Sequence, residues 1–285
     1  MSIREEMARQ EVEKKKRILK LLYAFIGIGV IICFFNILIG LLIVIPLVIL
    51  IVAAQTAKDI KHESQDFYGK ILNEMAPKIL KEVLPDAERF PEEGITKEEY
   101  ILSEFVESCD KYASRDKIIT PLILDGNKVN EIELYDLSHE ITDGADDKFY
   151  GIYAKISLPK DIRTKIKISS EGKYADGNIF KYEMDNKTFE NVFDVMAMNK
   201  KTVVDILTDD IMNFMLEIYN KYNYRVEVNI LRNMMHVRVI GKPEIIQASY
   251  GSEIDRIAVD NHYNIMKEVN ELIHRFYANI SKLEI

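Results

Sequence analysis

A continuous apolar run from Leu21 to Ala54 constrains this chain more than any other feature of its sequence. The run holds 34 residues and no charged side chain, and Asn36 near its middle carries a polar amide. One straight helix of this length would measure about 51 Å, whereas the hydrocarbon core of a bilayer is about 30 Å thick. A break between Asn36 and Gly40 gives two segments of about 17 residues, each at the short limit for a crossing. We therefore expect a transmembrane helical hairpin over residues 21–56, with a re-entrant segment and a single bent span as the alternatives.

Basic residues flank the apolar run on both sides. They are Lys14, Lys15, Lys16, Arg17 and Lys20 before the run and Lys58 and Lys61 after it. Because cytoplasmic flanks of membrane spans are enriched in Lys and Arg, a hairpin with both ends in the cytoplasm satisfies both flanks. We expect a multi-pass protein of the inner (cytoplasmic) membrane with both termini cytoplasmic. The basic cluster in the charged N-terminal segment, residues 1–20, is either a topology signal or a contact with anionic lipid.

The charge of the chain is unevenly distributed. Residues 1–20 hold seven Lys or Arg and four Asp or Glu, which gives +3, and the whole chain has a formal charge of −8. The remaining residues therefore carry −11, so phosphate backbones would repel them and nucleic acid is not an expected partner. The two cysteines, Cys33 in the apolar run and Cys109 outside it, do not form a disulfide framework, which is typical of a reducing cytoplasm.

Two linking helices are predicted in residues 57–108. Apolar residues recur every four positions from Phe67 to Val83, and Pro85 favours a helix end near Leu84. Thr96 and Glu99 form a capping-box pattern at the start of a second, short helix.

Residues 109–285 contain both strand and helix patterns. An Asp125-Gly126 turn between apolar segments predicts one β-hairpin, and a turn near Arg232-Asn233 predicts another. Helical periodicity over residues 207–222, with Thr208 as the cap, and over residues 259–283 predicts two helices. We therefore expect an α+β fold, in which a cytoplasmic domain of antiparallel strands packed with helices, ending in a C-terminal helix, follows the membrane hairpin.

Basic residues alternate with apolar ones in a strand predicted over residues 161–169. Arg163, Lys165 and Lys167 would project from one side of this strand. This basic face is a candidate contact for lipid headgroups or a phosphorylated partner. The alternative is an edge strand whose lysines prevent aggregation.

An ordered set of segments resembles a known family. The segments are "FYGKILNEMAPKILKEVLPD", "GITKEEY", "KVNEIELYDLSHEI", "FYGIYAKISL", "NKTFENVFDVMAMNKKTVVDILTDDIMNFMLEI" and "VEVNILRNMMHVRV". From Phe67 to about Val239 the chain resembles the bacterial family called domain of unknown function 3137. The resemblance implies a membrane protein with an N-terminal pair of spans and a cytoplasmic domain, and it implies no activity, catalytic residue or cofactor. The polar segment "DIRTKIKISSEGKYADGN" departs from the family pattern.

The sequence contains no motif for catalysis or cofactor binding. Its five histidines lack the spacing of a metal site, and it has no glycine-rich phosphate loop or nucleophile elbow. His139 with Asp143, Asp146 and Asp147 forms an acidic cluster for which a polar loop is the favoured interpretation and a cation site the alternative, and Cys109 is expected in the core. We therefore expect no catalytic, metal or cofactor-binding residues and no cofactor.

Three functions are compatible with these features. The leading expectation is a membrane-anchored, non-enzymatic cytoplasmic interaction module that binds a protein partner or lipid headgroups at the bilayer. One alternative is an enzyme whose site is assembled only in space. The other is an oligomeric pore or transporter accessory subunit, suggested by Asn36 and the kink-forming Pro46 in the apolar run. The sequence leaves the oligomeric state open.

Overall fold

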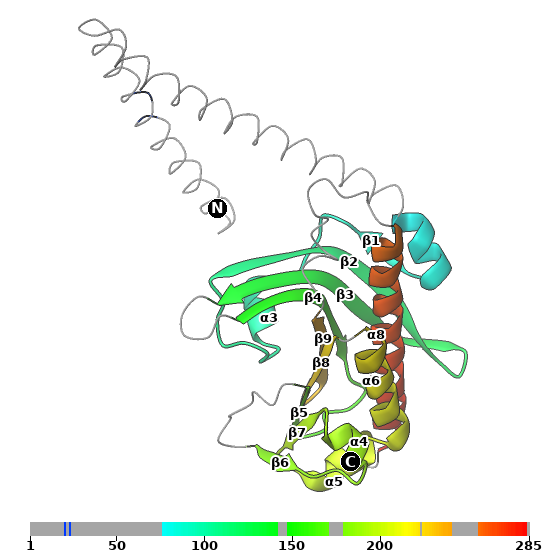
Figure 1. The fold of residues 1–285 in the computed structure, drawn as a ribbon. Coiled ribbons are helices and arrows are strands. Elements are labelled where there is room, and N and C mark those ends of the chain that lie inside the picture. Colours follow the sequence, from blue (N-terminus) through cyan, green and yellow to red (C-terminus); the bar gives the residue numbers. More distant parts are fainter. Residues whose placement is uncertain are drawn as a thin grey trace, which may run out of the picture. The chain divides into compact units, whose positions relative to one another are not determined.

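The computed structural model describes residues 20, 23, 76–141, 147–170, 179–222, 224–240 and 256–283 (Figure 1). The chain divides into two compact units, Met1–Gly69 and Lys70–Ile285. Apart from Tyr23, the predicted membrane hairpin lies outside the described residues. Within the described ranges, no helix is both long enough and apolar enough to cross a membrane.

Nine described strands form one antiparallel sheet (Figure 1). They are β1 (Glu88–Phe90), β2 (Lys111–Leu124), β3 (Asn127–Ile141), β4 (Asp147–Ser157), β5 (Lys165–Ser169), β6 (Phe180–Tyr182), β7 (Asp194–Ala197), β8 (Arg225–Leu231) and β9 (Met234–Ile240). Their order across the sheet is β1-β2-β3-β4-β9-β8-β5-β7-β6. The long strands β2, β3 and β4 therefore follow the short strand β1 at one end, and the short strands β5, β7 and β6 stand at the other.

Helices cover both sides of this sheet. Residues 76–83 are helical, and the other described helices are α3 (Lys97–Ile101), α4 (Lys187–Glu190), α5 (Lys200–Ile206), α6 (Asp209–Tyr222) and α8 (Arg256–Lys282). The helices α6 and α8 contact each other and run along one side of the sheet (Figure 1). The short helix α3 lies on the opposite side. It contacts His139 of β3 and Lys155 of β4, whereas α8 contacts Asp136 of β3, which points to the other side of the strand.

Strand alternation gives the sheet two buried faces. Leu134 and Tyr135 are neighbours on β3 and point to opposite sides, yet they are only 0% and 3% exposed. Leu134 belongs to the large apolar core under α6 and α8, whereas Tyr135 belongs to a smaller aromatic core with Tyr100 of α3. Strand side chains that point away from the large apolar core are therefore buried as well, and some of them are charged.

The predicted α+β fold is confirmed. The Asp125-Gly126 turn joins β2 to β3, and the turn at Arg232-Asn233 joins β8 to β9. Both long predicted helices are present as α6 and α8. Thr96 caps α3, and its hydroxyl accepts a hydrogen bond from the Glu99 amide at 3.2 Å.

Two details differ from the sequence-based expectation. Two linking helices were expected in residues 57–108, and between them Glu88–Phe90 forms an unpredicted strand that pairs with Lys117–Ile119 of β2. The edge-strand interpretation of the basic segment is wrong, because β5 lies between β8 and β7 and pairs with both. Strand order depends on pairing between residues far apart in the chain, which the local pattern of β5 does not encode.

Candidate functional site

One face of the sheet carries polar side chains in two aligned rows. The first row is Tyr135, Tyr153, Arg238, Glu227 and Ser169, and the second row is Glu133, Lys155, His236, Asn229 and Lys167. Successive members of each row are register partners on β3, β4, β9, β8 and β5. We call these ten residues the polar face.

A buried ion pair lies at the centre of the polar face. Arg238 Nε contacts Glu227 Oε2, and the two residues are 5% and 3% exposed. Ser169 donates a hydrogen bond to Glu227 Oε1 at 3.2 Å, and Arg238 Nη1 donates to the Tyr100 hydroxyl oxygen at 3.1 Å. These additional partners offset part of the cost of taking both charges out of water.

The helix α3 and the turn after it cover this ion pair. Tyr100 of α3 is fully buried, and its ring packs edge-on against Tyr153 with ring centroids 5.3 Å apart. Burial raises the pKa of Tyr100 to about 12, so the phenol stays protonated at neutral pH. Asn229 donates to the backbone carbonyl of Ser103 at 2.9 Å, which fixes the turn to β8.

His139 belongs to this covered region and not to a polar loop. Its Nδ1 lies 3.2 Å from the Tyr100 hydroxyl oxygen, and the residue is 1% exposed within β3. Asp147 begins β4, while Asp143 and Asp146 lie outside the described residues. The sequence-based explanation of this cluster as a polar loop therefore does not apply to His139.

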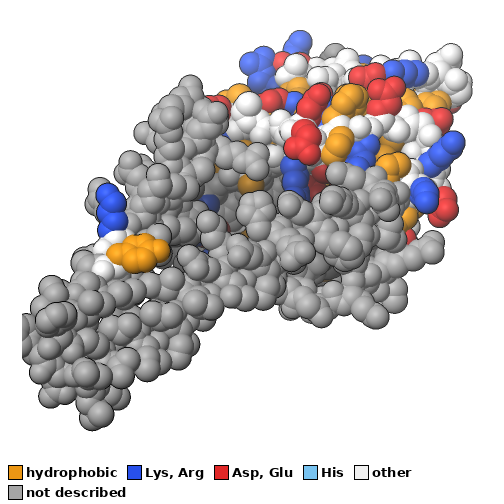
Figure 2. Space-filling view, turned by 90° about the horizontal axis from the view of Figure 1, so that it is seen from above, with side chains coloured by type: hydrophobic (Ala, Val, Ile, Leu, Met, Phe, Trp, Pro, Cys, Tyr) orange, Lys and Arg blue, Asp and Glu red, His pale blue; other side chains and the backbone are white. Residues whose placement is uncertain are grey.

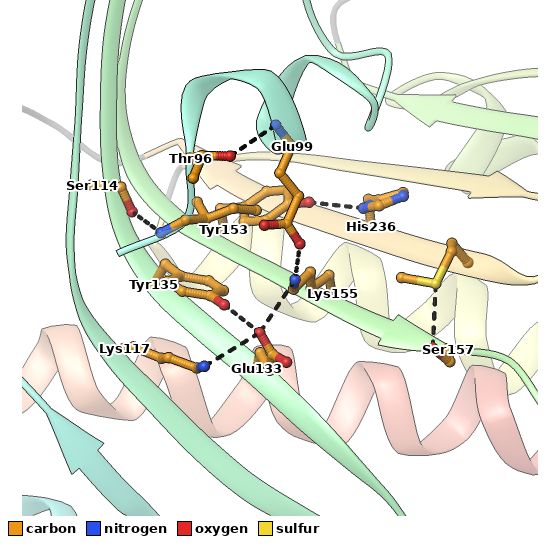
Figure 3. A network of polar contacts seen from close by, with 12 residues as sticks. Thr96, Glu99, Ser114, Lys117, Glu133, Tyr135, Tyr153, Lys155, Ser157 and His236 are labelled. Carbon is orange, nitrogen blue, oxygen red and sulfur yellow. Dashed lines mark hydrogen bonds and ion pairs between the residues drawn. The ribbon is translucent and has the colours of Figure 1, made fainter. Parts of the chain in front are cut away.

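A chain of alternating charges links α3 to three strands (Figure 3). Lys155 Nζ contacts Glu99 of α3 and lies 3.3 Å from Glu133 Oε2, and Lys117 Nζ lies 3.9 Å from the same Glu133 oxygen. The Tyr135 hydroxyl also donates to Glu133. Burial opposes the charge of Glu133, but these donors outweigh it and hold the pKa of Glu133 below its usual value. The acidic and basic groups in this chain therefore compensate one another.

His236 is a buried neutral member of the polar face. Its Nδ1 lies 2.8 Å from the Tyr153 hydroxyl oxygen, as Figure 3 shows, and the residue is 6% exposed. Burial, helped by the positive charge of Lys155, lowers the pKa of His236 to about 4. The imidazole is therefore uncharged at neutral pH.

Lys165 and Lys167 lie on the same side of β5 and contact one carboxylate. Lys165 Nζ is 2.8 Å from each carboxylate oxygen of Glu104, and Lys167 Nζ is 3.2 Å from Glu104 Oε2. Lys167 is buried at 5% exposure. Arg163 is exposed, but it precedes the strand and has a φ of 50°. The three predicted residues therefore do not form one uninterrupted basic stripe, and Glu104 is a partner that the sequence pattern did not identify.

The other predicted candidates, Lys14, Lys15, Lys16 and Arg17, lie outside the described residues. On the surface seen in Figure 2, the described acidic and basic side chains are intermixed. That side of the described surface therefore offers no area of a single charge.

A second buried polar cluster joins α8 to the other face of the sheet. His262 Nε2 lies 2.8 Å from Asp136 Oδ1, and Arg89 Nε lies 2.5 Å from Asp116 Oδ1. The Tyr263 hydroxyl donates to Asp116 Oδ2 at 3.3 Å. Burial, together with the charge of nearby Asp136, raises the pKa of Asp116. Two carboxylates are thus held close together, with one guanidinium and one imidazole.

A surface depression of about 500 Å³ borders this cluster. It is lined by Pro77, Leu80, Lys81, Pro85, Ala87, Arg89 and Pro91. Among the residues that the structure describes, no group of three or more His, Cys, Asp or Glu is arranged to hold a metal ion. Cys109 is 3% exposed, which confirms its predicted place in the core.

The ion pair of the polar face was missed at the sequence level, although a signal for it existed. A two-residue turn at Arg232-Asn233 places residue 227 opposite residue 238, and these residues carry opposite charges. Alternation with Val226 and Val228 places Glu227 on the opposite side of the strand but does not show what covers that side. The structure shows instead that this face is covered.

The fold and the site define an α+β protein with one antiparallel sheet, whose polar face is covered by α3. Residues 147–283 match the model of a family described as "Protein of unknown function (DUF3137)". The match confirms, over residues 147–283, the resemblance to this family that the sequence predicted. The match begins at β4 and extends through α8.

One further match is to a solved structure at low similarity. The crystal structure of the mycobacterial trehalose monomycolate transport factor A, TtfA, aligns with 70% of this chain and 94% of its own, at 8% sequence identity and a TM-score of 0.38. No curated protein matches the chain in sequence.

Proposed function

We propose that this chain is a membrane-anchored, non-enzymatic module whose folded unit binds a partner protein in the cytoplasm. The observation that carries the proposal is a group of exposed apolar side chains at the β6 end of the sheet. Phe180, Met198 and Val204 are 64%, 53% and 54% exposed. Large apolar side chains gathered at one place on a surface are typical of protein interaction sites.

These three side chains come from neighbouring elements. Phe180 of β6 is the register partner of Ala197, the last residue of β7, and Met198 follows directly. The helix α5, which carries Val204, begins at Lys200. Figure 1 shows β6, β7 and α5 together at one end of the sheet. A short strand that ends the described sheet also offers backbone groups to an added strand.

The membrane part of the proposal rests on the apolar run and its flanks. Two crossings within residues 21–56 agree with the length of the apolar run. Cytoplasmic ends agree with the basic residues on both sides of it, because Lys and Arg are enriched in cytoplasmic flanks. A hairpin of this kind leaves the folded unit at the inner face of the membrane. Partners in that compartment would then reach the β6 end.

Cysteine labelling in intact cells tests the topology. Cys109 is a poor reporter because it is 3% exposed, whereas the Glu131 side chain is 51% exposed. Asn36→Cys and Glu131→Cys are made in a chain whose own cysteines are replaced by serine. An impermeant reagent should label position 36 in intact cells and position 131 only after lysis. Labelling of position 131 in intact cells would contradict the cytoplasmic placement.

Site-specific photo-crosslinking tests the interface. A photoreactive side chain at position 180 or 198 of the full chain in its membrane should yield the same discrete protein adduct. The matched control carries the photoreactive group at Glu131, on the remote strand β3, and should not yield this adduct. Val204→Asp should weaken the adduct at position 180 without changing expression. An identical adduct from position 131 would rule out a specific interface at the β6 end.

A further inference from the structure

The carboxylate of Glu104 contacts two lysines of β5. The ammonium groups of Lys165 and Lys167 both lie within 3.2 Å of the Glu104 carboxylate. We propose that Lys165 and Lys167 form a binding site for a phosphate group, and that Glu104 holds this site in the free protein as an internal competitor. The site is separate from the apolar interface proposed above and does not depend on it.

Glu104 is positioned to leave the lysines without unfolding its surroundings. Its side chain is 38% exposed, so solvent and ligands reach the carboxylate. Its φ of 58° is in the left-handed region, which is unfavourable for a residue with a side chain. Tyr100 and Phe105 on either side of it are buried at 0% and 7% exposure and hold the segment to the sheet. Rotation of the Glu104 side chain therefore withdraws its carboxylate from both lysines.

The two lysines suit a phosphate group. Each ammonium group supplies three rotatable donors, and lysine binds phosphate as a point charge. A phosphate monoester carries about −1.5 to −2 charges near neutral pH and three acceptor oxygens, whereas a carboxylate carries one charge and two oxygens. Two ammonium groups on one side of a strand therefore interact more strongly with the phosphate than with the carboxylate.

The same face of the sheet continues toward a further cation. Lys167 is paired with Met196 of β7, and Met196 is paired with Lys181 of β6. The Lys181 side chain is 58% exposed and contacts Asp194. Lysines of β5 and β6 therefore lie on this face, together with the Asp194 carboxylate of β7.

Lysine footprinting by acetylation and mass spectrometry tests the site in the full chain. The protein is held in nanodiscs of zwitterionic phosphatidylcholine, and inorganic phosphate is compared with chloride at equal ionic strength. The variant Glu104→Gln removes the competing charge with little change in shape. The matched control is Glu131→Gln, which releases the exposed Lys128 from its 2.5 Å ion pair far from β5.

Phosphate should slow the acetylation of Lys165 but not that of Lys128. The phosphate concentration for half protection should be about fivefold lower in Glu104→Gln than in the wild type. Glu104→Asp, which keeps the charge on a shorter side chain, should give an intermediate value and serves if Glu104→Gln does not fold. In a second arm, nanodiscs contain phosphatidic acid and no free phosphate. Protection of Lys165 there identifies a lipid headgroup as the source, and protection only by inorganic phosphate identifies a soluble one.

Three results would overturn the proposal. Lys165 could be unprotected in both arms, the Glu104 variants could match the wild type, or Lys128 in Glu131→Gln could be protected as strongly as Lys165. The last result would mean that any released surface lysine binds phosphate equally well. None of these results bears on photo-crosslinking at the β6 end, so the two proposals fail separately.

Discussion

Glu227 and Arg238 face each other across the β8–β9 hairpin and form an ion pair that is almost completely removed from solvent. A buried pair of this kind is expensive to break, because removal of one partner leaves the other charged and desolvated. Through Arg238, this ion pair also connects the β8–β9 hairpin to Tyr100 of α3.

Replacement of Arg238 by leucine should lower the free energy of unfolding by about 3–5 kcal/mol, since Glu227 is left unpaired. The control Arg275→Leu removes a partly exposed arginine that pairs with Asp210 and Glu271, and should cost about 1 kcal/mol. Urea unfolding of the full chain in micelles, monitored by circular dichroism, measures the free energy of unfolding of both variants. The double variant Glu227→Leu/Arg238→Leu should be less destabilised than the sum of its single variants; simple additivity would contradict the pairing.

Acidification should destabilise the protein through His236. The folded pKa of about 4 lies below the ordinary value of 6.5, so protonation favours the unfolded chain. The stabilisation is present above about pH 6.5 and is lost as the pH falls toward about 4, with a total of about 3 kcal/mol. His236→Gln should lack this part of the pH dependence when urea unfolding is compared at several pH values in that window. Equal slopes for variant and wild type would show that His236 is not the group responsible.

His262 should give a pH dependence of the opposite sign. Burial disfavours its charge, but the ion pair with Asp136 and the field of Asp116 outweigh burial and raise the pKa of His262 above its usual 6.5. The protonated imidazole therefore stabilises the fold fully below about pH 6.5, and the contribution is lost as the pH rises through the raised value. Wild type should lose stability relative to His262→Gln as the pH rises above about 6.5. A parallel decline of both proteins would contradict the ion pair with Asp136.

Gly151 should not tolerate a side chain. A Cβ atom at this position would lie 2.0 Å from the carbonyl oxygen of Val239 on the neighbouring strand β9. Since backbone is in the way, Gly151→Ala should cost more than about 3 kcal/mol in the free energy of unfolding. The control Gly126→Ala in the β2–β3 turn meets no atom within 4 Å but has a φ of 78°, and should cost about 1 kcal/mol. Equal losses would mean that β4 and β9 can separate at Gly151.

Local patterns predicted most of the fold. The turns at Asp125-Gly126 and Arg232-Asn233, the cap at Thr96 and the helices α6 and α8 all follow from short-range rules of turn and helix chemistry. Strand β1 was missed because it has three residues, too few for an alternation to be recognised.

The candidate site depends on contacts between residues that are far apart in the chain. The alternation in β5 correctly placed Lys165 and Lys167 on one side, but it did not indicate what faces them. Glu104 reaches these lysines from a turn 61 residues earlier in the chain. His262 and Asp136 are likewise joined only by the packing of α8 on the sheet.

The sequence by itself determined the two long helices, the two hairpin turns, the α+β class and the family resemblance, because turn residues, caps and periodicity act over a few positions. The tertiary structure alone decided the strand order, the burial of the polar face and the partners of its charges. A strand pattern indicates which residues share a side, but the energy of each charge depends on what covers that side. For β5 this cover includes Glu104, and for β8 and β9 it is α3 with Tyr100 and the turn that follows.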